Sequence, residues 1–287
     1  MTLHANRFMR RLAVACLLQP AVACAWAQDG LHTDPYGLRT HSTMAGGGLA
    51  NILDTYLSPY SYTGEHAAFI YETDRPLHRW SKDSISPRLH LRQSICLDGS
   101  HVQNPARNTT EWAGGIDYSA AWLYTLTHRP LSGRLTLEAG PMAEAYAGGI
   151  YNEHDGNNPA QAKASVTLNA ALRASLRFRL LRREALARYT LSVPLLGMAF
   201  SPAYGQSYYE AFGLGHYDHN IVLAHPANMP SMRHLLSVDL PLRPSRSATC
   251  IRLGYAADIM QSRFNGLRYH AYSHTFLIGV TRTFRRL

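Results

Sequence analysis

Polar side chains that could carry out chemistry gather in three short stretches: HDGNN at 154–158, FSPAYGQSYYEAF at 200–212 and GHYDHN at 215–220. In the last of these, His216, Asp218 and His219 could ligate a metal ion or act as an acid–base pair. Their spacing matches neither the i, i+4 pattern of a helical metal site nor a recognised metal-binding loop. The spacing therefore favours a polar loop, and we predict no metal and no cofactor.

The first stretch combines an imidazole, a carboxylate and two amides. His154, Asp155, Asn157 and Asn158 could bind a ligand through these groups. Asp-Gly and Asn-Asn also tolerate positive φ, and Pro159 ends the segment, so a turn accounts for the same residues. We retain Asn157 and Asn158 as candidate binding or plug residues within such a turn.

The elements that would position these loops are recognisable from a period of two. Over residues 165–180, SVTLNAALRASLRFRL, every even position is apolar, and every odd position except Ala171 is polar. A helix would place apolar residues three and four positions apart, whereas strict alternation indicates a strand with one apolar and one polar face. The run exceeds an ordinary strand and is long enough to cross a bilayer at a tilt.

The same alternation recurs and predicts ten strands. They cover residues 46–57, 65–76, 86–98, 112–127, 133–150, 160–180, 186–197, 232–242, 248–260 and 269–284. The connections alternate in length, with short turns at 128–132, 181–185 and 243–247 and longer loops at 99–111, 151–159, 198–231 and 261–268. If the short turns are periplasmic, as in bacterial barrels, both termini lie on the periplasmic side.

We therefore predict an all-β fold, a single antiparallel transmembrane β-barrel of about 10–12 strands with short periplasmic turns and longer extracellular loops. The higher count applies if residues 198–231 contain a further hairpin. A secreted or periplasmic β-sandwich or small barrel would also alternate, but strand length and loop alternation favour the membrane barrel.

The N-terminus predicts export. MTLHANRFMRR is basic, the following LAVACLLQPAVACAWA is uncharged, and Ala25 and Ala27 precede QDG. These features are typical of a secretory signal peptide that is cleaved after Ala27. We expect a signal peptide at 1–27, a periplasmic segment at 28–45 and a barrel at 46–287, located in the outer membrane of a Gram-negative cell.

Composition narrows the possible partners. Loss of the predicted signal peptide would lower the formal net charge from +9 to +6, because three arginines leave and no acid does. In an exported protein this basic balance indicates lipid headgroups that carry phosphate and not nucleic acid. Cys96 and Cys250 would be the remaining cysteines; two are too few for a disulfide framework, and without a C-x-x-C pair a structural zinc site is disfavoured.

The polar strand faces place charges of both signs in the predicted lumen. The candidate lumen charges are Arg134, Glu138, Glu144, Arg173, Arg177, Asp239, Arg252 and Asp258, together with Arg88, His90, Arg92, Asp117, Arg179 and Arg233. An ion-pair network that fills a narrow barrel is at least as consistent with this pattern as an open channel. A barrel of this size is too small for a wide aqueous pore.

The stretch 200–212 falls in the longest predicted loop. Tyrosine joins an apolar ring to a polar tip, which suits a membrane interface or a barrel mouth. We predict a structured lid or plug, in which Glu210 could pair with a lumen arginine such as Arg173 or Arg177. The candidate binding residues are Tyr204, Gln206, Tyr208, Tyr209 and Glu210.

Several stretches together resemble a known family. They are ILDTYLSPYSYTG (52–64), GGIYNEHDGNNPAQAKA (148–164), FSPAYGQSYYEAF (200–212) and HPANMPSMRHLLSVDLPL (225–242). They resemble a Bacteroidetes family of uncharacterised exported proteins, domain of unknown function 3316, which is expected to form outer-membrane barrels. The resemblance implies an architecture and a location, but it transfers no catalytic or ligand residue to these positions.

The expected function is non-enzymatic: surface binding, narrow solute passage or envelope organisation. The expected partners are outer-membrane lipid or lipopolysaccharide and, during biogenesis, the barrel assembly machinery. The alternatives are a lipid-acting barrel hydrolase and a soluble periplasmic binding protein. Outer-membrane phospholipase A holds its serine in a His-x-Ser-Asn-Gly arrangement, whereas the nearest stretch here, HDGNN, contains no serine. A nucleophilic serine also needs a base and an orienting group within reach, which the sequence does not reveal.

Overall fold

The computed structural model describes residues 38–77, 88–126, 134–156, 158–180, 183–217, 219–242 and 249–285. These residues lie within one compact unit, Tyr36–Leu287. Within them, no helix is long and apolar enough to cross a membrane.

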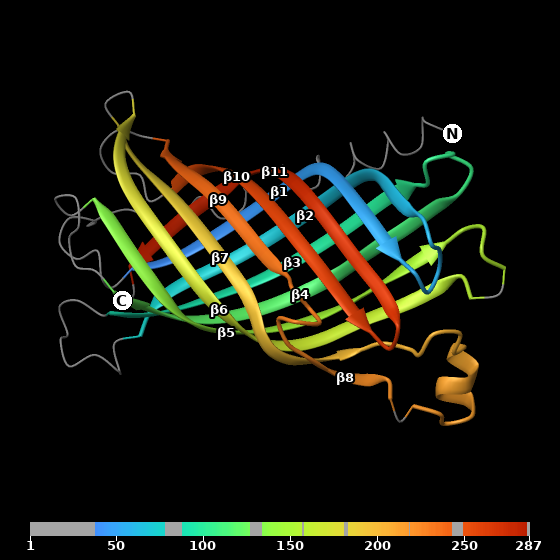
Figure 1. Cartoon of the computed structure of the whole chain (residues 1–287). Helices are drawn as coiled ribbons and strands as arrows, with labels where there is room; N and C mark the ends of the chain where they lie inside the picture. The colour runs from blue at the N-terminus through green and yellow to red at the C-terminus, as the bar shows by residue number, and fades with distance from the viewer. Residues whose placement is uncertain are drawn as a thin grey trace. The chain divides into compact units, whose positions relative to one another are not determined.

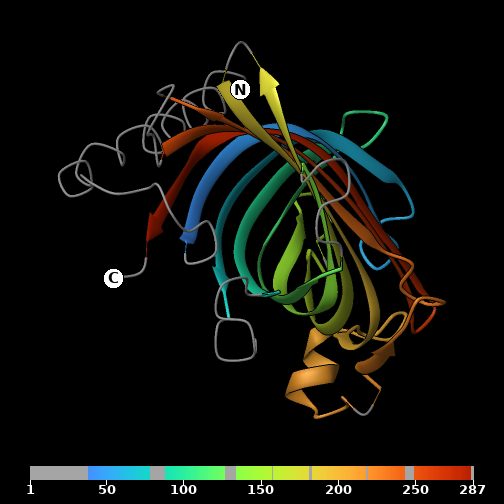
Figure 2. The ribbon, with the colours of Figure 1, turned by 90° about the vertical axis from the view of Figure 1, so that its left-hand side faces the viewer.

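In this described part of the chain, consecutive antiparallel strands form a meander that closes on itself (Figures 1 and 2). The strands are β1 (Leu38–Asp54), β2 (Ser61–Pro76), β3 (Leu89–Gln103), β4 (Thr110–Thr125), β5 (Leu135–Asn152), β6 (Ala160–Leu180), β7 (Arg183–Phe200), β8 (Ile221–Ala224), β9 (Met232–Pro241), β10 (Thr249–Phe264) and β11 (Leu267–Arg285). β7 pairs with β9, and β11 returns to pair with β1 along its whole length. Ten of these strands therefore close the barrel, which confirms the predicted fold class.

The two ends of the barrel differ. We call the end that holds residues 38 and 285 the terminus end, and the end that holds residues 201–231 the loop end. The short β8 pairs with the last residues of β7 at the loop end, beyond the point where β7 leaves β9. The described residues of 198–231 thus contain one short strand that extends the wall and no further pair of barrel strands, so ten strands close the barrel and not twelve.

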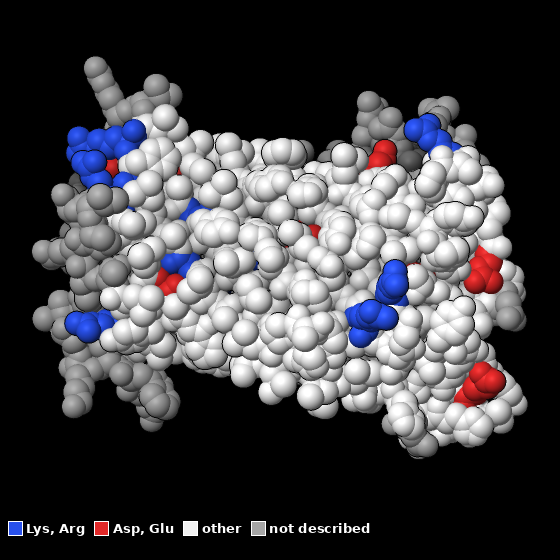
Figure 3. Space-filling view, viewed as in Figure 1, with Lys and Arg blue, Asp and Glu red and all other residues white. Residues whose placement is uncertain are grey.

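Alternation separates an apolar outer wall from a polar lumen. On β6, Val166, Leu168 and Leu172 are exposed on the outside, whereas Thr167 and Asn169 are buried on the inside. The face in Figure 3 is mostly free of charge, and its charged residues gather toward the two ends. An apolar band between polar ends is the surface that a bilayer requires of a barrel.

Small apolar clusters fill the lumen between its polar side chains. One consists of Met44, Ile70, Leu235, Ala256 and Leu277, contributed by five different strands. Others lie near the loop end around Ile52, Tyr62 and Val102 and on β4–β6 around Ala121, Leu123 and Met142. The core of this protein is therefore the barrel interior itself, as expected for a barrel narrow enough to be filled by side chains.

Two strand boundaries correct the sequence-based prediction. β1 begins at Leu38 and not at residue 46, so residues 38–45 belong to the barrel and not to the predicted periplasmic segment. The predicted long loop at 261–268 is a tight hairpin, because Asn265 and Gly266 have φ values of 50° and 79° and form the whole connection between β10 and β11. Asn-Gly with both φ values positive is the preferred two-residue hairpin turn.

The loop-end connection predicted at 99–111 is also shorter than predicted, since β3 ends at Gln103 and β4 begins at Thr110. Several strands extend past their predicted ends and shorten the loops there. At the loop end, the longest stretch between two barrel strands is 201–231.

Candidate functional site

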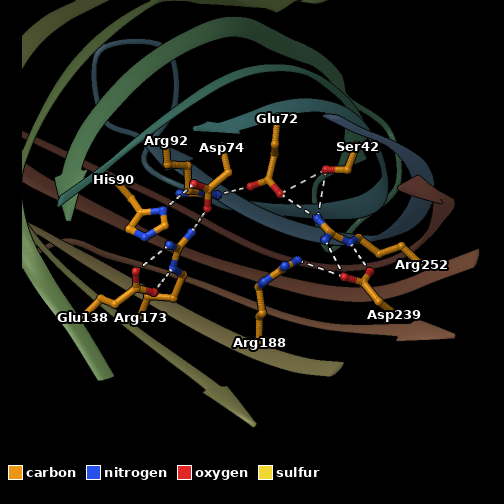
Figure 4. A network of polar contacts seen from close by, with 10 residues as sticks. All are labelled: Ser42, Glu72, Asp74, His90, Arg92, Glu138, Arg173, Arg188, Asp239 and Arg252. Carbon is orange, nitrogen blue, oxygen red and sulfur yellow. Dashed lines mark hydrogen bonds and ion pairs between the residues drawn. The ribbon is translucent and has the colours of Figure 1, made fainter. Parts of the chain in front are cut away.

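Ion pairs cross the lumen near the terminus end (Figure 4). Four arginines and four carboxylates point inward from seven strands. They are Arg92, Arg173, Arg188 and Arg252 with Glu72, Asp74, Glu138 and Asp239. The charges balance, and we call this set the terminus-end network.

Arg252 on β10 is the most thoroughly bonded member. Its Nε and Nη2 donate to the two oxygens of Asp239 at 2.6 and 2.8 Å, and its Nη1 donates to Glu72 Oε2 at 3.0 Å and to Ser42 Oγ at 2.9 Å. A guanidinium that binds a carboxylate with two parallel bonds holds it in a fixed plane. Arg252 therefore fixes β9, β10, β1 and β2 relative to one another.

Arg173 on β6 links a second group of strands. It donates to both oxygens of Glu138 on the neighbouring β5 and also to Asp74 on β2. His90 lies 3.4 Å from the same Asp74 through its Nδ1. Because β2 and β6 are separated by three strands on one side and five on the other, the contact of Arg173 with Asp74 crosses the lumen.

A second set of charges lies at mid-height, and we call it the Arg233 cluster. Arg233 on β9 approaches Asp117 at 3.1 Å, Glu144 at 3.5 Å and Asp258 at 3.1 Å. Asp117 Oδ2 and the Asn169 side-chain oxygen are buried here without a hydrogen-bond partner among the described residues. One guanidinium thus faces three carboxylates, so this level has an excess of hydrogen-bond acceptors, whereas the terminus-end network is balanced.

A third cross-lumen contact lies near the loop end. Lys163 Nζ on β6 lies 2.7 Å from Asp54 Oδ2 on β1 and 4.0 Å from the centre of the Tyr269 ring. β1 and β6 lie opposite each other in the barrel, with four strands between them in either direction. Cations and carboxylates therefore meet across the lumen at three levels.

Two small spaces lie among these levels. A cavity of about 50 Å³ lies at the loop end between β6–β7 and β10–β11, lined by polar groups such as Gln161 and Lys163 and by apolar ones such as Met229 and Phe264. A second space of about 20 Å³ lies inside the terminus-end network. Both have room for one or a few waters.

The segment 201–231 spreads over one rim of the loop end, with a short π-helix at Tyr209–Gly213. Its first part meets the opposite rim, because Tyr56 donates its hydroxyl hydrogen to the Gln206 carbonyl oxygen at 2.9 Å and its ring packs edge-on against Tyr208. Tyr208 in turn accepts a hydrogen bond from the Ala162 backbone N–H at 2.6 Å. Burial raises the pKa of Tyr56 to about 12 and raises that of Tyr208, so both phenols are neutral donors and acceptors here.

The rest of the segment lies outside the barrel ring (Figures 1 and 2). Tyr204 and Tyr209 are more than two-thirds exposed, and Phe212, Tyr217 and Ile221 are also exposed. Of the five binding candidates in this stretch, Gln206 and Tyr208 thus join the rim contacts, whereas Tyr204, Tyr209 and Glu210 point away from the lumen.

The predicted pairing of Glu210 with Arg173 or Arg177 is wrong. Glu210 is fully exposed, and its carboxylate accepts hydrogen bonds from the Ser207 backbone N–H at 2.7 Å and from the Ser207 hydroxyl at 3.1 Å. The Glu210 N–H returns a bond to Ser207 Oγ at 3.2 Å. Ser-x-x-Glu with these reciprocal contacts is a capping box, so a local bond replaces the long-range pair. The Ser207 donors lower the pKa of Glu210.

The remaining candidates divide between the lumen and its edges. Glu138, Glu144, Arg173, Asp239, Arg252 and Asp258 belong to the two charge sets in the lumen. Arg134 and Arg177 are exposed at the terminus end, where their backbones bond to each other. Asn158 forms part of a turn, in which its N–H donates to Asp155 Oδ1. Asn157 lies outside the described residues.

Nothing in the described residues forms a metal cluster of three or more histidine, cysteine or acidic side chains. Asp218, one of the three residues weighed as metal ligands, lies outside them. A buried serine–histidine pair does occur in the lumen, with His66 Nδ1 2.9 Å from Ser100 Oγ. Both residues are buried, so a substrate would have to enter the barrel to reach them.

Five charged residues of these contacts were not among the predicted lumen charges: Asp54, Glu72, Asp74, Lys163 and Arg188. Alternation along each strand is sufficient to find them. On β2, the even positions from Tyr62 to Asp74 face the lumen, and the same parity places Asp54 inside β1. Their partners could not be predicted in this way, because the partners come from strands that are distant in the sequence.

A closed meander of ten antiparallel strands, with an apolar wall and a lumen filled by ion pairs, is the architecture of an outer-membrane β-barrel. The chain belongs to a family described as protein of unknown function (DUF3316), whose model matches residues 11–287. The resemblance seen in the sequence is thereby confirmed as to family, whereas its assignment to Bacteroidetes stays a prediction. A comparison with curated protein sequences finds no match.

Several solved structures are similar. The outer membrane protease OmpT from Escherichia coli has a TM-score of 0.46 and 9% identity, covering 90% of this chain and 100% of that chain. The transport unit of the autotransporter AIDA-I from Escherichia coli has a TM-score of 0.48 and 8% identity, covering 95% and 97%. The translocator domain of the autotransporter NalP from Neisseria meningitidis has a TM-score of 0.40 and 12% identity, covering 98% and 96%.

Proposed function

We propose that this protein is a closed, non-enzymatic outer-membrane barrel that acts through its outer surface and its loop end, in surface binding and envelope organisation, and not as a conduit for solutes. The observation that carries the proposal is the closure of the lumen at three levels. Lys163 meets Asp54, Arg233 meets Asp117 and Arg173 meets Asp74, each across the interior.

Closure by ion pairs differs from closure by a flexible loop. Asp54, Asp117 and Arg173 are all more than nine-tenths buried, and each has its partner in place. Opening a path would separate buried charges, and leaving a buried charge without its partner costs about 3–5 kcal/mol. Three such levels in series support a lumen that stays shut on its own.

An outer-membrane location agrees with the apolar wall, with the length of the strands and with the predicted signal peptide. The exposed aromatic and aliphatic side chains of residues 204–223 continue this wall at the loop end. They are Tyr204, Tyr209, Phe212, Leu214, Tyr217, Ile221 and Leu223. An apolar surface of this kind marks an interaction site with lipid or protein, which supports a role at the surface.

Conductance tests the proposal. Purified full-length protein inserted into planar bilayers should give no stable conductance. A triple variant K163A/R173A/R233A, which shortens the cation at each level, should conduct and should prefer cations because the lumen keeps its carboxylates. The matched control R177A/R179A/R183A shortens three exposed arginines at the terminus end and should stay silent.

Heat-modifiable gel mobility should be checked first, to show that each variant is folded. Stable conductance of the unmodified protein would overturn the proposal. A folded triple variant that stays silent would show that these cations do not close the lumen. Hydrolysis of phospholipid or peptide by the unmodified protein, abolished in Ser100→Ala, would overturn its non-enzymatic part.

A further inference from the structure

Two arginines face each other on the outside of the barrel at the loop end. Arg263 and Arg268 are directly opposite in the β10–β11 hairpin, one pair before Phe264 and Leu267. Phe264 and Leu267 are buried in the lumen, so by alternation their neighbours Arg263 and Arg268 point outward, and both are exposed.

This arrangement is unfavourable by itself. Like charges directly opposite on adjacent strands destabilise a sheet. Among the described residues, no carboxylate forms an ion pair with either guanidinium, whereas every arginine of the terminus-end network has one. Figure 3 shows this basic patch over the end of the β10–β11 hairpin, with white surface around it and no acidic residue beside it. Arg263 and Arg268 therefore have no anionic partner among the described residues.

The backbone holds both arginines firmly. Arg268 exchanges two hydrogen bonds with Thr55, from its N–H to Thr55 Oγ1 at 2.8 Å and from the Thr55 N–H to its carbonyl oxygen at 3.0 Å. The Arg263 N–H donates to the Asn228 carbonyl oxygen at 2.8 Å. The hairpin is thus fixed on both sides, by Thr55 and by Asn228, and the backbone positions of the two arginines are fixed with it.

The outward face changes from basic to apolar toward the middle of the barrel. The next outward pair is Gln261 and His270, and the one after it is Ile259 and Tyr272. The rings of His270 and Tyr272 stack at 4.5 Å. Phe276 and Ile278 follow on β11, and both are more than 60% exposed. Cations above an aromatic ring and an aliphatic band match a ligand with an anionic head and hydrocarbon chains.

We propose that Arg263 and Arg268 form a binding site for the phosphate of a membrane lipid in the leaflet at the loop end. Two guanidinium groups offer the paired donors that suit phosphate oxygens, and a phosphate would neutralise the repulsion between them. The lipid chains lie along Tyr272 and the apolar wall below it. The inference rests on the proposed function, since it requires a barrel in the outer membrane with its loop end in the lipopolysaccharide leaflet.

Binding to purified lipid tests the site. Full-length protein in detergent is titrated with diphosphoryl lipid A, and the bound fraction is measured by native mass spectrometry. The unmodified protein and the control R177Q/R179Q, which removes two exposed arginines at the other end, should bind alike. R263Q/R268Q should bind more weakly by roughly tenfold or more, because charge-assisted bonds are lost. R263K/R268K should retain part of the affinity.

Two further probes identify the chemistry. Dephosphorylated lipid A should bind as weakly to the unmodified protein as diphosphoryl lipid A binds to R263Q/R268Q, and inorganic phosphate should compete only at much higher concentration. Equal binding of diphosphoryl lipid A by R263Q/R268Q and the unmodified protein would overturn the site. Inorganic phosphate that competes as well as lipid A would overturn the assignment to a lipid. Conductance of the unmodified protein would instead contradict the proposed function, and it would leave the binding result readable by itself.

Discussion

Asp54 and Lys163 belong to strands on opposite sides of the barrel, yet the Asp54 carboxylate lies 2.7 Å from the Lys163 ammonium group. Asp54 is only 1% exposed. The Tyr269 ring covers the ammonium group from β11 at 4.0 Å. The Gln161 side-chain amide, turned so that its nitrogen faces Asp54, donates to the same carboxylate. This contact closes the lumen just below the rim where Tyr56 meets Gln206.

We expect removal of either partner to destabilise the barrel strongly. Asp54→Asn or Lys163→Met leaves the other charge buried without its counterpart, which costs about 3–5 kcal/mol in the free energy of unfolding. Denaturant unfolding in detergent or lipid vesicles, followed by tryptophan fluorescence, measures the change.

Two comparisons give this result its meaning. The double variant D54N/K163M should lose less than the sum of the two single variants, because it leaves no unpaired charge. Glu65→Gln, which neutralises an exposed carboxylate on β2, should change stability by less than about 0.5 kcal/mol. If the single variants were no less stable than Glu65→Gln, the pair would not be a determinant of the barrel.

Tyr56 is the residue through which the two rims touch. Tyr56→Phe removes the hydroxyl that donates to the Gln206 carbonyl oxygen but keeps the ring against Tyr208, so we expect a loss of about 1 kcal/mol. The effect should be local: amide exchange should accelerate at residues 203–208 and stay unchanged at mid-barrel. Tyr60→Phe, on the same loop but well exposed, is the control and should have no effect on this exchange. Equal exchange in the two variants would refute a role for the Tyr56 hydroxyl in holding the segment.

Glu210 gives the 207–213 segment a dependence on pH. Its pKa is lowered because the Ser207 N–H and hydroxyl bond the charged form. A carboxyl whose folded pKa lies below its unfolded value of about 4.3 stabilises the fold above that value and ceases to do so as the pH falls through the folded pKa. We therefore expect a titration midpoint below that of an ordinary glutamate, measured by carboxyl NMR shifts. Ser207→Ala should raise the midpoint; an unchanged midpoint would contradict the capping contact.

Alternation was sufficient to predict the barrel strands and the inward direction of many charged residues in the lumen. It predicted that Glu138, Arg173, Asp239 and Arg252 face inward, and each of them does so. Inward direction depends only on parity within a strand, which the sequence shows directly. The partners depend on how the barrel closes: Arg173 and Asp74 are 99 residues apart, and only the stagger of ten strands brings them together. That information is not local.

Loop structure was predicted least well. The sequence SYYE at 207–210 contains the Ser-x-x-Glu pattern of a capping box. Glu210 forms this local contact with Ser207 in place of the long-range pair expected for it. The hairpin at Asn265–Gly266 carries the strongest short-range turn signal that a sequence offers, but the polar residues around it suggested a loop. In both cases a specific short-range pattern was more informative than polarity.

Gly266 tests whether this turn sets the end of the barrel. With φ at 79° it occupies a conformation that other residues adopt at a cost of about 1–2 kcal/mol, so Gly266→Ala should lower the free energy of unfolding by about 1 kcal/mol or more. Gly156 is the matched control, because a Cβ added there meets nothing within 4 Å and its φ is not positive. Gly156→Ala should leave stability unchanged or raise it slightly by restricting the unfolded chain. Denaturant unfolding measured in parallel compares the two. If Gly266→Ala were as stable as Gly156→Ala, the turn would tolerate another backbone conformation, and Arg263 and Arg268 would not be held in fixed register by it.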